Sequence, residues 1–227
     1  REGVKIIRIE PYADGVRVVL KKEDGEETVD GSHLLVATGR RPNVAGLNLE
    51  NAGIEYSEKG ILVDARLRTT NKKVFAIGDV AGGFLFTHVA GYHASVVIKN
   101  ALFRLPAKAD HSAVPWVTYT APELAQVGLN EDSAKQAGKD FRILRWSFHE
   151  NDRAQAEGVT DGLVKAIVTP KGHILGCGIV GSHAGELIQP WVLAMGEKLK
   201  IGAMATMIAP YPTLGEVSKR AAISFYT

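Results

Sequence analysis

The sequence has 227 residues, 45% of them hydrophobic, with 27 basic and 25 acidic residues and a formal net charge of +2. This composition predicts a substantial core in one or two domains, and the balanced charge argues against a nucleic-acid partner. No apolar run is long enough to span a membrane and the first residues do not resemble a signal peptide, so we expect a cytoplasmic protein with no membrane partner.

The first segment is typical of antiparallel strands. Residues 4–9 and 16–21 are two strand candidates around a hairpin turn at residues 13–15, and residues 27–30 predict a third short strand. Residues 34–37 are uninterrupted apolar residues, which favours a short buried strand.

A turn follows that buried strand. Thr38 and Gly39 end it, and Pro42 fixes an extended exit from the turn. For Arg40 and Arg41 two interpretations stay equally open, a solvated turn and a contact with a cofactor phosphate. Further on, residues 47–52 before Gly53 predict a short helix, and residues 60–64 a brief strand.

Residues 74–83 (VFAIGDVAGG) contain the most informative pattern of the chain. Residues 74–77 predict a buried strand that stops at Gly78 and Asp79, and ligands of open α/β sheets bind in the crevice beyond such strand ends. Gly82 and Gly83 would let the backbone approach a ligand closely. A carboxylate in this place can hold the hydroxyl groups of a sugar or sugar alcohol, whereas an ordinary strand-to-turn role is the alternative.

The next two segments suggest a helix and a domain boundary. Residues 84–104 predict a helix, with apolar residues such as Val89 and Val96 at helical spacing and Pro106 after its end. Residues 107–111 are small and polar, and we place a domain boundary there.

The remaining residues predict an α+β arrangement of strands with helices on one side. The expected strands are residues 113–118, 124–128, 141–148, 163–169 and 173–180, and the expected helices are residues 131–137 capped by Asn130, residues 185–199 with a late start or kink at Pro190, and residues 213–225. Trp116, Tyr119 and Trp191 are large enough to anchor an interface, although core packing is the commoner use of such residues.

Cysteine and histidine usage restricts the chemistry. The single cysteine, Cys177, excludes a cysteine redox pair within these residues, and its apolar neighbours predict a buried structural thiol. No pair of the seven histidines has zinc-site spacing, so no metal site is predicted.

Three motifs in this order resemble those of the pyridine nucleotide–disulfide oxidoreductases, a family of flavoproteins: residues 33–43 (HLLVATGRRPN), 70–79 (TNKKVFAIGD) and 212–216 (PTLGE). The resemblance implies an α/β portion followed by an α+β dimerisation domain. Residues 1–38 would be the tail of the NAD(P)-binding domain, residues 39–108 the C-terminal segment of the FAD-binding domain, and residues 109–227 the part that forms a homodimer. It also implies that a missing N-terminal half holds the dinucleotide fingerprints, so the isolated segment is expected to be inactive.

The same resemblance implies FAD and NAD(P)H as cofactors and suggests which residues bind them. Asp79 would hold the ribityl chain of FAD, and the backbone N–H groups at the start of the long helix would face the flavin ring, because a helix N-terminus favours negative charge. For the imidazole of His88, a helix-start position without a direct role is equally open. The cofactor-binding residues implied in this way are Thr38, Gly39, Gly78, Asp79, Phe86, Thr87 and His88.

The catalytic assignment rests on Tyr211 and Glu216, which would line the partner subunit's site. Family members that reduce disulfides have a histidine where this chain has Tyr211, and a phenol, whose pKa is about 10, is a poor substitute for an imidazole base. Glu216 retains half of the family's dyad, or is an acidic residue in a first helical turn.

The leading hypothesis is therefore an FAD-dependent NAD(P)H oxidoreductase that passes hydride to flavin and then to an acceptor. Two alternatives remain open. One is a disulfide or metal-ion reductase in which another group supplies the proton, and the other is a non-catalytic dimerisation module.

Overall fold

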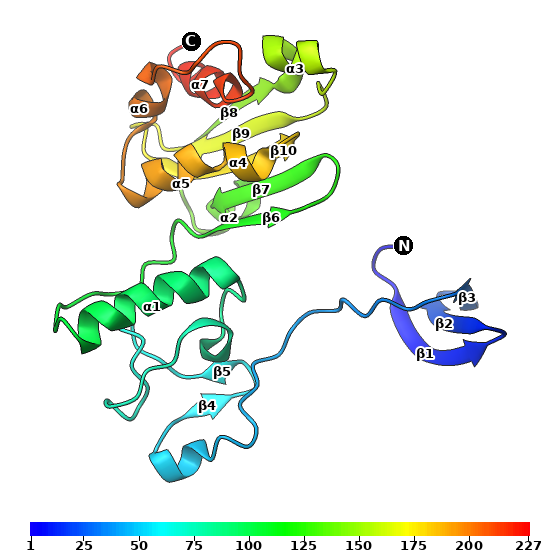
Figure 1. Cartoon of the computed structure of the whole chain (residues 1–227). Coiled ribbons are helices and arrows are strands. Elements are labelled where there is room, and N and C mark those ends of the chain that lie inside the picture. The colour runs from blue at the N-terminus through cyan, green and yellow to red at the C-terminus, as the bar shows by residue number, and fades with distance from the viewer.

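The computed structural model describes residues 1–227, a mixed α/β chain with three antiparallel sheets (Figure 1). The first sheet has the order β1-β2-β3, the second pairs β4 with β5, and the third has the order β6-β7-β10-β9-β8. The strands are β1 (Lys5–Tyr12), β2 (Gly15–Lys22), β3 (Gly25–Gly31), β4 (Tyr56–Ser57), β5 (Gly60–Ile61), β6 (Pro115–Thr118), β7 (Glu123–Gly128), β8 (Arg142–Ser147), β9 (Leu163–Val168) and β10 (Ile174–Gly181).

The chain also has seven α-helices and three short 3-10 helices, and the last four α-helices follow the last strand. The α-helices are α1 (Thr87–Ala101), α2 (Glu131–Gln136), α3 (Asp152–Glu157), α4 (Ala184–Leu187), α5 (Gln189–Gly196), α6 (Ile201–Thr206) and α7 (Glu216–Ile223), and the 3-10 helices are η1 (Leu49–Ala52), η2 (Gly78–Ala81) and η3 (Phe148–Glu150). None of the helices is both long and apolar enough to cross a bilayer.

The first sheet confirms the three strands predicted at the N-terminus. β1 and β2 form a hairpin in which Ile9 is opposite Val18, and β3 continues the meander. Figure 1 shows the sheet standing apart from the remaining chain, at the end of an extended segment over residues 32–43. Several of its apolar side chains, Ile6 and Ile9 among them, are exposed, whereas Val19 and Leu20 are buried.

Two of the predictions of a buried strand were wrong. Residues 34–37 form no strand, and the side chains of Leu35 and Val36 are 87% and 70% exposed. Residues 74–77 contain only one isolated bridge, from Phe75 to Arg68, and Ile77 is exposed. An apolar run becomes a strand only when a neighbouring strand satisfies its N–H and C=O groups, and no strand of this chain lies along either run.

The middle of the chain has a small core of its own. Leu49, Ile54, Ile61 and Ala76 are buried together, and this cluster joins η1, the β4–β5 hairpin and the segment before η2. The short helix predicted before Gly53 is confirmed as η1, with Gly53 in the left-handed region at φ 66°. The predicted strand over residues 60–64 is only two residues long.

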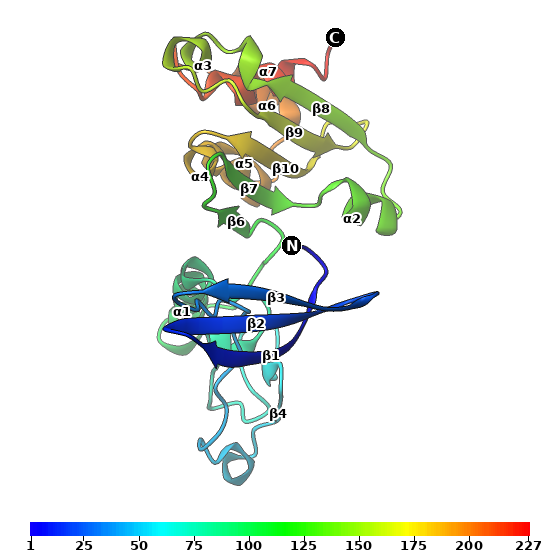
Figure 2. The same cartoon turned by 90° about the vertical axis from the view of Figure 1, so that its right-hand side faces the viewer.

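The five-stranded sheet holds the main core, a cluster of 20 buried residues. Helices α4, α5 and α7 contact its strands, and Figures 1 and 2 show α4 to α7 gathered on one side of the sheet. Trp191 on α5 is fully buried, which confirms core packing for this residue. Cys177 is also fully buried, and burial raises the pKa of its thiol well above the ordinary value, as a structural cysteine requires.

Local signals predicted several helices of this part. Asn130 caps α2 in a capping box with Ser133, whose N–H donates to Asn130 Oδ1 at 2.8 Å. The predicted helix over residues 185–199 is broken at Ile188 into α4 and α5, with Pro190 in the first turn of α5. The final helix is confirmed in shorter form as α7, whereas α3 and α6 were not predicted.

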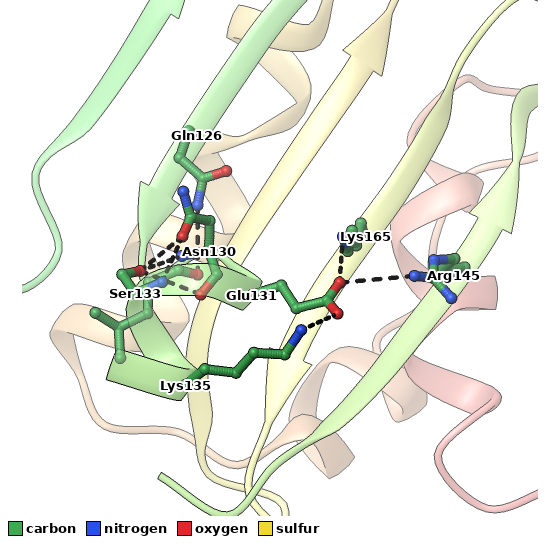
Figure 3. Close-up of polar contacts among 8 residues, drawn as sticks. Gln126, Asn130, Glu131, Ser133, Lys135, Arg145 and Lys165 are labelled. Atoms are coloured by element: carbon green, nitrogen blue, oxygen red, sulfur yellow. Dashed lines mark hydrogen bonds and ion pairs between the residues drawn. The ribbon is translucent and has the colours of Figure 1, made fainter. Parts of the chain in front are cut away.

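Charged side chains hold α2 against the face of the sheet opposite the core (Figure 3). Lys165 lies between the buried Val164 and Ala166 on β9, so it points to the other face. The Glu131 carboxylate contacts Lys165 at 2.8 Å, Lys135 at 2.9 Å and Arg145 at 3.9 Å. Hydrogen bonds from Lys165 and then Lys135 lower the pKa of Glu131 to about 2, so this carboxylate stays ionised even in mild acid.

Candidate cofactor site

The Gly78–Asp79 turn lies directly against helix α1. Gly78 begins η2 with φ +65°, and a Cβ added there would be 2.8 Å from the Cβ of Ala90. Both the left-handed backbone and the close approach of α1 therefore require glycine at this position. The sequence predicted the end of a strand at this position, whereas the structure has a 3-10 turn packed on a helix.

The Asp79 carboxylate is partly exposed and meets one of the two motif arginines. Its side chain is 31% exposed, and its Oδ2 is 2.5 Å from Nη2 of Arg40. The structure thus joins the first two motifs of the sequence through one ion pair. The Arg40 side chain is 69% exposed, so it is solvated as well as paired with a carboxylate, and contact with a cofactor phosphate stays a prediction.

The other residues of the first motif remain open to solvent. Thr38 and Gly39 are exposed, and Gly39 has φ +111° with no atom within 4 Å of an added Cβ. Thr38 therefore does not lie in a packed site of this chain, and its role in binding a cofactor stays a prediction.

Helix α1 begins with a free N-terminus. Its N-cap residue, Phe86, has an extended backbone and no side-chain cap, and its first turn contains no acidic residue. The first N–H groups of a helix lack partners within it, and the helix dipole gives this end partial positive charge, so Thr87 and His88 present donors to an electron-rich group.

The imidazole of His88 has a structural partner. Its Nε2 lies 2.9 Å from the carbonyl oxygen of Pro115, to which it donates, and its ring stacks on Phe86 with centroids 5.1 Å apart. His88 therefore ties the start of α1 to strand β6. This contact favours the interpretation in which the backbone, rather than the ring, faces a cofactor.

A cavity of about 700 Å³ opens at this end of α1. Its volume is typical of a small-molecule site. Asp79 does not line it, so the carboxylate and the cavity are separate features around the first turns of α1. The cavity is lined by Leu85, Phe86, Thr87, His88, Pro115, Trp116, Val117, Tyr119, Gly185, Ile188, Gln189, Val192 and Leu193.

Tyr211 and Glu216 lie elsewhere: Glu216 is the first residue of α7, and Tyr211 contacts Asp152 on α3. Figure 1 shows both helices at the end of the five-stranded sheet away from α1. The exposed Tyr211 hydroxyl donates to Oδ2 of Asp152 at 3.0 Å, and the N–H of Thr213 donates to Oε2 of Glu216 at 3.4 Å. Sequence reasoning missed Asp152, because nothing in its local pattern links it to Tyr211. One chain therefore does not bring these two residues to the Gly78–Asp79 turn.

The Asp152 carboxylate controls the ionisation of Tyr211. Its hydrogen bond is the largest cause of the raised pKa of the phenol, and the charge of Glu216 raises the pKa slightly further. A group whose pKa is raised keeps its proton to higher pH, so Tyr211 is a hydrogen-bond donor throughout the neutral range. It cannot serve as a base there.

We expect Asp152→Asn to lower the pKa of Tyr211 toward about 10, because asparagine keeps an acceptor but removes the charge. The ultraviolet absorbance of phenolate, followed as the pH rises, measures this change, with Tyr211→Phe identifying the signal among the six tyrosines. Glu157→Gln on the same helix is the matched control and should leave the signal in place. An unchanged Tyr211 titration in Asp152→Asn would contradict the assignment.

Comparisons with known proteins agree on one family. The sequence model "Pyridine nucleotide-disulphide oxidoreductase" matches residues 1–94, and the model "Pyridine nucleotide-disulphide oxidoreductase, dimerisation domain" matches residues 114–222. The chain is 36% identical over 216 residues to a dihydrolipoyl dehydrogenase of Bacillus subtilis, covering 94% of this chain and 46% of that protein. It is 35% identical over 225 residues to a mercuric reductase of Staphylococcus aureus, covering 98% and 41%.

Solved structures give the same result. The structure of LpdA from Mycobacterium tuberculosis is similar with a TM-score of 0.89 and 28% identity, over 97% of this chain and 48% of that one. The Cu(II) complex of the HOCl-induced flavoprotein disulfide reductase RclA from Escherichia coli is similar with a TM-score of 0.85 and 28% identity, over 97% and 50%. The chain thus spans about half the length of the relatives it matches.

Proposed function

Because the chain belongs to the pyridine nucleotide-disulphide oxidoreductase family, we propose that it is the C-terminal part of an FAD-dependent NAD(P)H oxidoreductase. In this proposal hydride passes from NAD(P)H to flavin and then to an acceptor. The proposal of a longer protein rests on the share of each relative that the chain covers, and on the exposed apolar side chains of the first sheet and of residues 34–36.

We further propose three parts within the chain. Residues 1–38 complete an NAD(P)-binding domain, residues 39–108 return to an FAD-binding domain, and residues 109–227 form the dimerisation domain of a homodimer. The last assignment is supported by the family model for that region and by large exposed side chains on it, such as Tyr119, Leu193 and Ile208. Such side chains are common at protein interfaces.

Asp79 is the residue on which the proposed FAD site depends. Arg40 contacts Oδ2, which orients the carboxylate and leaves Oδ1 free to accept hydrogen bonds from the hydroxyl groups of the ribityl chain. The uncapped start of α1 complements this acceptor, because its N–H groups suit the electron-rich edge of a flavin. The donor and acceptor groups present therefore fit FAD, whose bound isoalloxazine would supply the hydride chemistry.

Tyr211 restricts which electron acceptor the flavin could reduce. Because Tyr211 keeps its only proton and donates it to Asp152, the phenol oxygen would accept a hydrogen bond from a group in the partner subunit's site and would not take a proton from a thiol. This disfavours disulfide reduction by the histidine route. A disulfide or metal-ion reductase with another proton donor remains the second candidate, because the mercuric reductase of Staphylococcus aureus is about as similar to the chain as the dihydrolipoyl dehydrogenase is.

Asp79→Ala in the complete flavoprotein tests the proposal. Removing a charged acceptor of hydroxyl groups is expected to weaken FAD binding about tenfold or more, so the purified variant should lose the visible flavin absorbance. Asp79→Asn keeps one acceptor oxygen and should lose less. Asp132→Ala, at an exposed carboxylate of α2, is the control and should keep its flavin.

Two outcomes would count against the proposal in different ways. Unchanged flavin content in Asp79→Ala would remove this residue from the site. A colourless complete wild-type protein that also fails to bind added FAD would instead favour the non-catalytic dimerisation module.

A further inference from the structure

A buried histidine on α1 holds the backbone of the Gly78–Asp79 turn. His93 is only 3% exposed, and its Nδ1 lies 3.1 Å from the backbone nitrogen of Gly78. Its Nε2 lies 2.7 Å from Nε2 of His111, which comes from the segment that connects α1 to β6. The two imidazole rings are nearly perpendicular, with an interplanar angle of 79°.

The hydrogen bonds determine the protonation of both rings. The Gly78 amide is a donor, so His93 Nδ1 must accept and carries no proton. A neutral His93 then carries its proton on Nε2, and that nitrogen donates to His111. His111 Nε2 must therefore be the acceptor, which places the proton of this ring on Nδ1.

We propose that His93 is a positioning residue that fixes the Gly78–Asp79 turn through its Nδ1, and that His111 supports the required tautomer of His93 by accepting from its Nε2. The inference rests on the proposed function, because this turn is where the FAD polyol chain is expected to bind. It adds two residues that the sequence motifs do not contain.

The geometry explains why the turn needs such an anchor. Gly78 has a left-handed backbone, so the direction of its N–H is not set by regular secondary structure. His93 supplies the acceptor that a buried amide requires, and the orientation of the next residue, Asp79, follows from the same backbone. Burial lowers the pKa of His93, and so does the repulsion that a protonated His111 would exert on a second charge, which keeps the His93 ring neutral and able to accept.

The first test uses the chain itself and needs no flavin. Long-range proton–nitrogen NMR of the histidine rings should show a protonated Nε2 in His93 and a protonated Nδ1 in His111. His111→Ala removes the acceptor of the Nε2 proton and should raise the fraction of His93 that is protonated on Nδ1. A protonated Nδ1 in wild-type His93 would overturn the proposal.

The second test compares two substitutions that place an acceptor differently. Asparagine puts its side-chain oxygen near the position of Nδ1, whereas glutamine reaches the position of Nε2. In the complete flavoprotein, His93→Asn should keep FAD affinity within about twofold, whereas His93→Gln and His93→Ala should weaken it about tenfold by leaving the Gly78 amide unpaired.

Equal losses in His93→Asn and His93→Gln, with both variants folded, would show a packing role only and overturn the proposal. If even the wild-type complete protein binds no FAD, the proposed function fails, and the Gly78 amide resonance of the chain decides the inference instead. That resonance should shift in His93→Gln and stay near its wild-type position in His93→Asn.

Discussion

Replacing Trp191 by alanine is expected to lower the free energy of unfolding by about 3 to 5 kcal/mol, the range for a large aromatic side chain removed from a core. Trp191 is fully buried on α5 within the main core. Its indole Nε1 donates to the hydroxyl oxygen of Ser218 on α7 at 3.0 Å. The substitution therefore removes apolar packing and also a buried hydrogen bond between two helices.

Two further variants separate these contributions. Trp191→Phe keeps much of the apolar volume but leaves the Ser218 hydroxyl without its donor, a loss of about 1 to 3 kcal/mol. Adding Ser218→Ala to Trp191→Phe removes both polar partners and should recover part of that loss. Gln136→Ala on α2 is the control, because this side chain is exposed and its loss should cost within about 0.5 kcal/mol.

Urea unfolding of the chain followed by circular dichroism measures these differences without relying on tryptophan fluorescence. A cost for Trp191→Ala no larger than that for Gln136→Ala would show that Trp191 is not a core anchor. The interface role considered from the sequence would then regain support.

Local signals explain why much of the C-terminal domain could be predicted. The Asn130 cap, the hairpin at residues 170–172 and the Pro190 break each act within a few residues, so their patterns are visible in the sequence. The strand predictions for residues 34–37 and 74–77 were wrong for the opposite reason. Their apolar composition indicates a tendency toward burial, but a strand also needs a neighbour, and pairing depends on segments distant in sequence.

The residues of the candidate site also fall into two groups, those recognisable from the sequence and those that only the fold reveals. The motif glycine and carboxylate, Gly78 and Asp79, are recognisable because the chemistry and the backbone both restrict those positions. His93, His111 and Asp152 were missed, because each acts through a partner that only the fold brings near. Asp152 lies 59 positions from Tyr211, and His93 lies 18 positions from His111.

Gly78→Ala is expected to release FAD from the complete flavoprotein and to lower its thermal stability. An alanine at φ +65° carries a backbone strain of about 1 to 2 kcal/mol, and its Cβ would sit 2.8 Å from the Cβ of Ala90. Relief of that contact moves η2 away from α1, at a further cost of about 1 to 3 kcal/mol, and moves Asp79 with it. Flavin absorbance and the melting temperature of the purified variant measure the two effects.

A matched glycine separates the contact from the strain. Gly53 also has a left-handed backbone, with φ +66°, but an added Cβ there meets no atom within 4 Å. Gly53→Ala should therefore show the strain alone, a modest fall in melting temperature with flavin retained. Equal flavin loss at both glycines would mean that packing of the turn against α1 does not position the cofactor site.

A compensating substitution on α1 completes the argument. In Gly78→Ala/Ala90→Gly the offending Cβ of Ala90 is absent, and the nearest remaining atom, the Ala90 Cα, is at an ordinary 3.5 Å. Because glycine within a helix costs about 1 kcal/mol by itself, the double variant must be compared with Ala90→Gly rather than with wild type. Flavin restored to the Ala90→Gly level would assign the loss to this one contact, whereas no recovery would assign it to the left-handed backbone of Gly78.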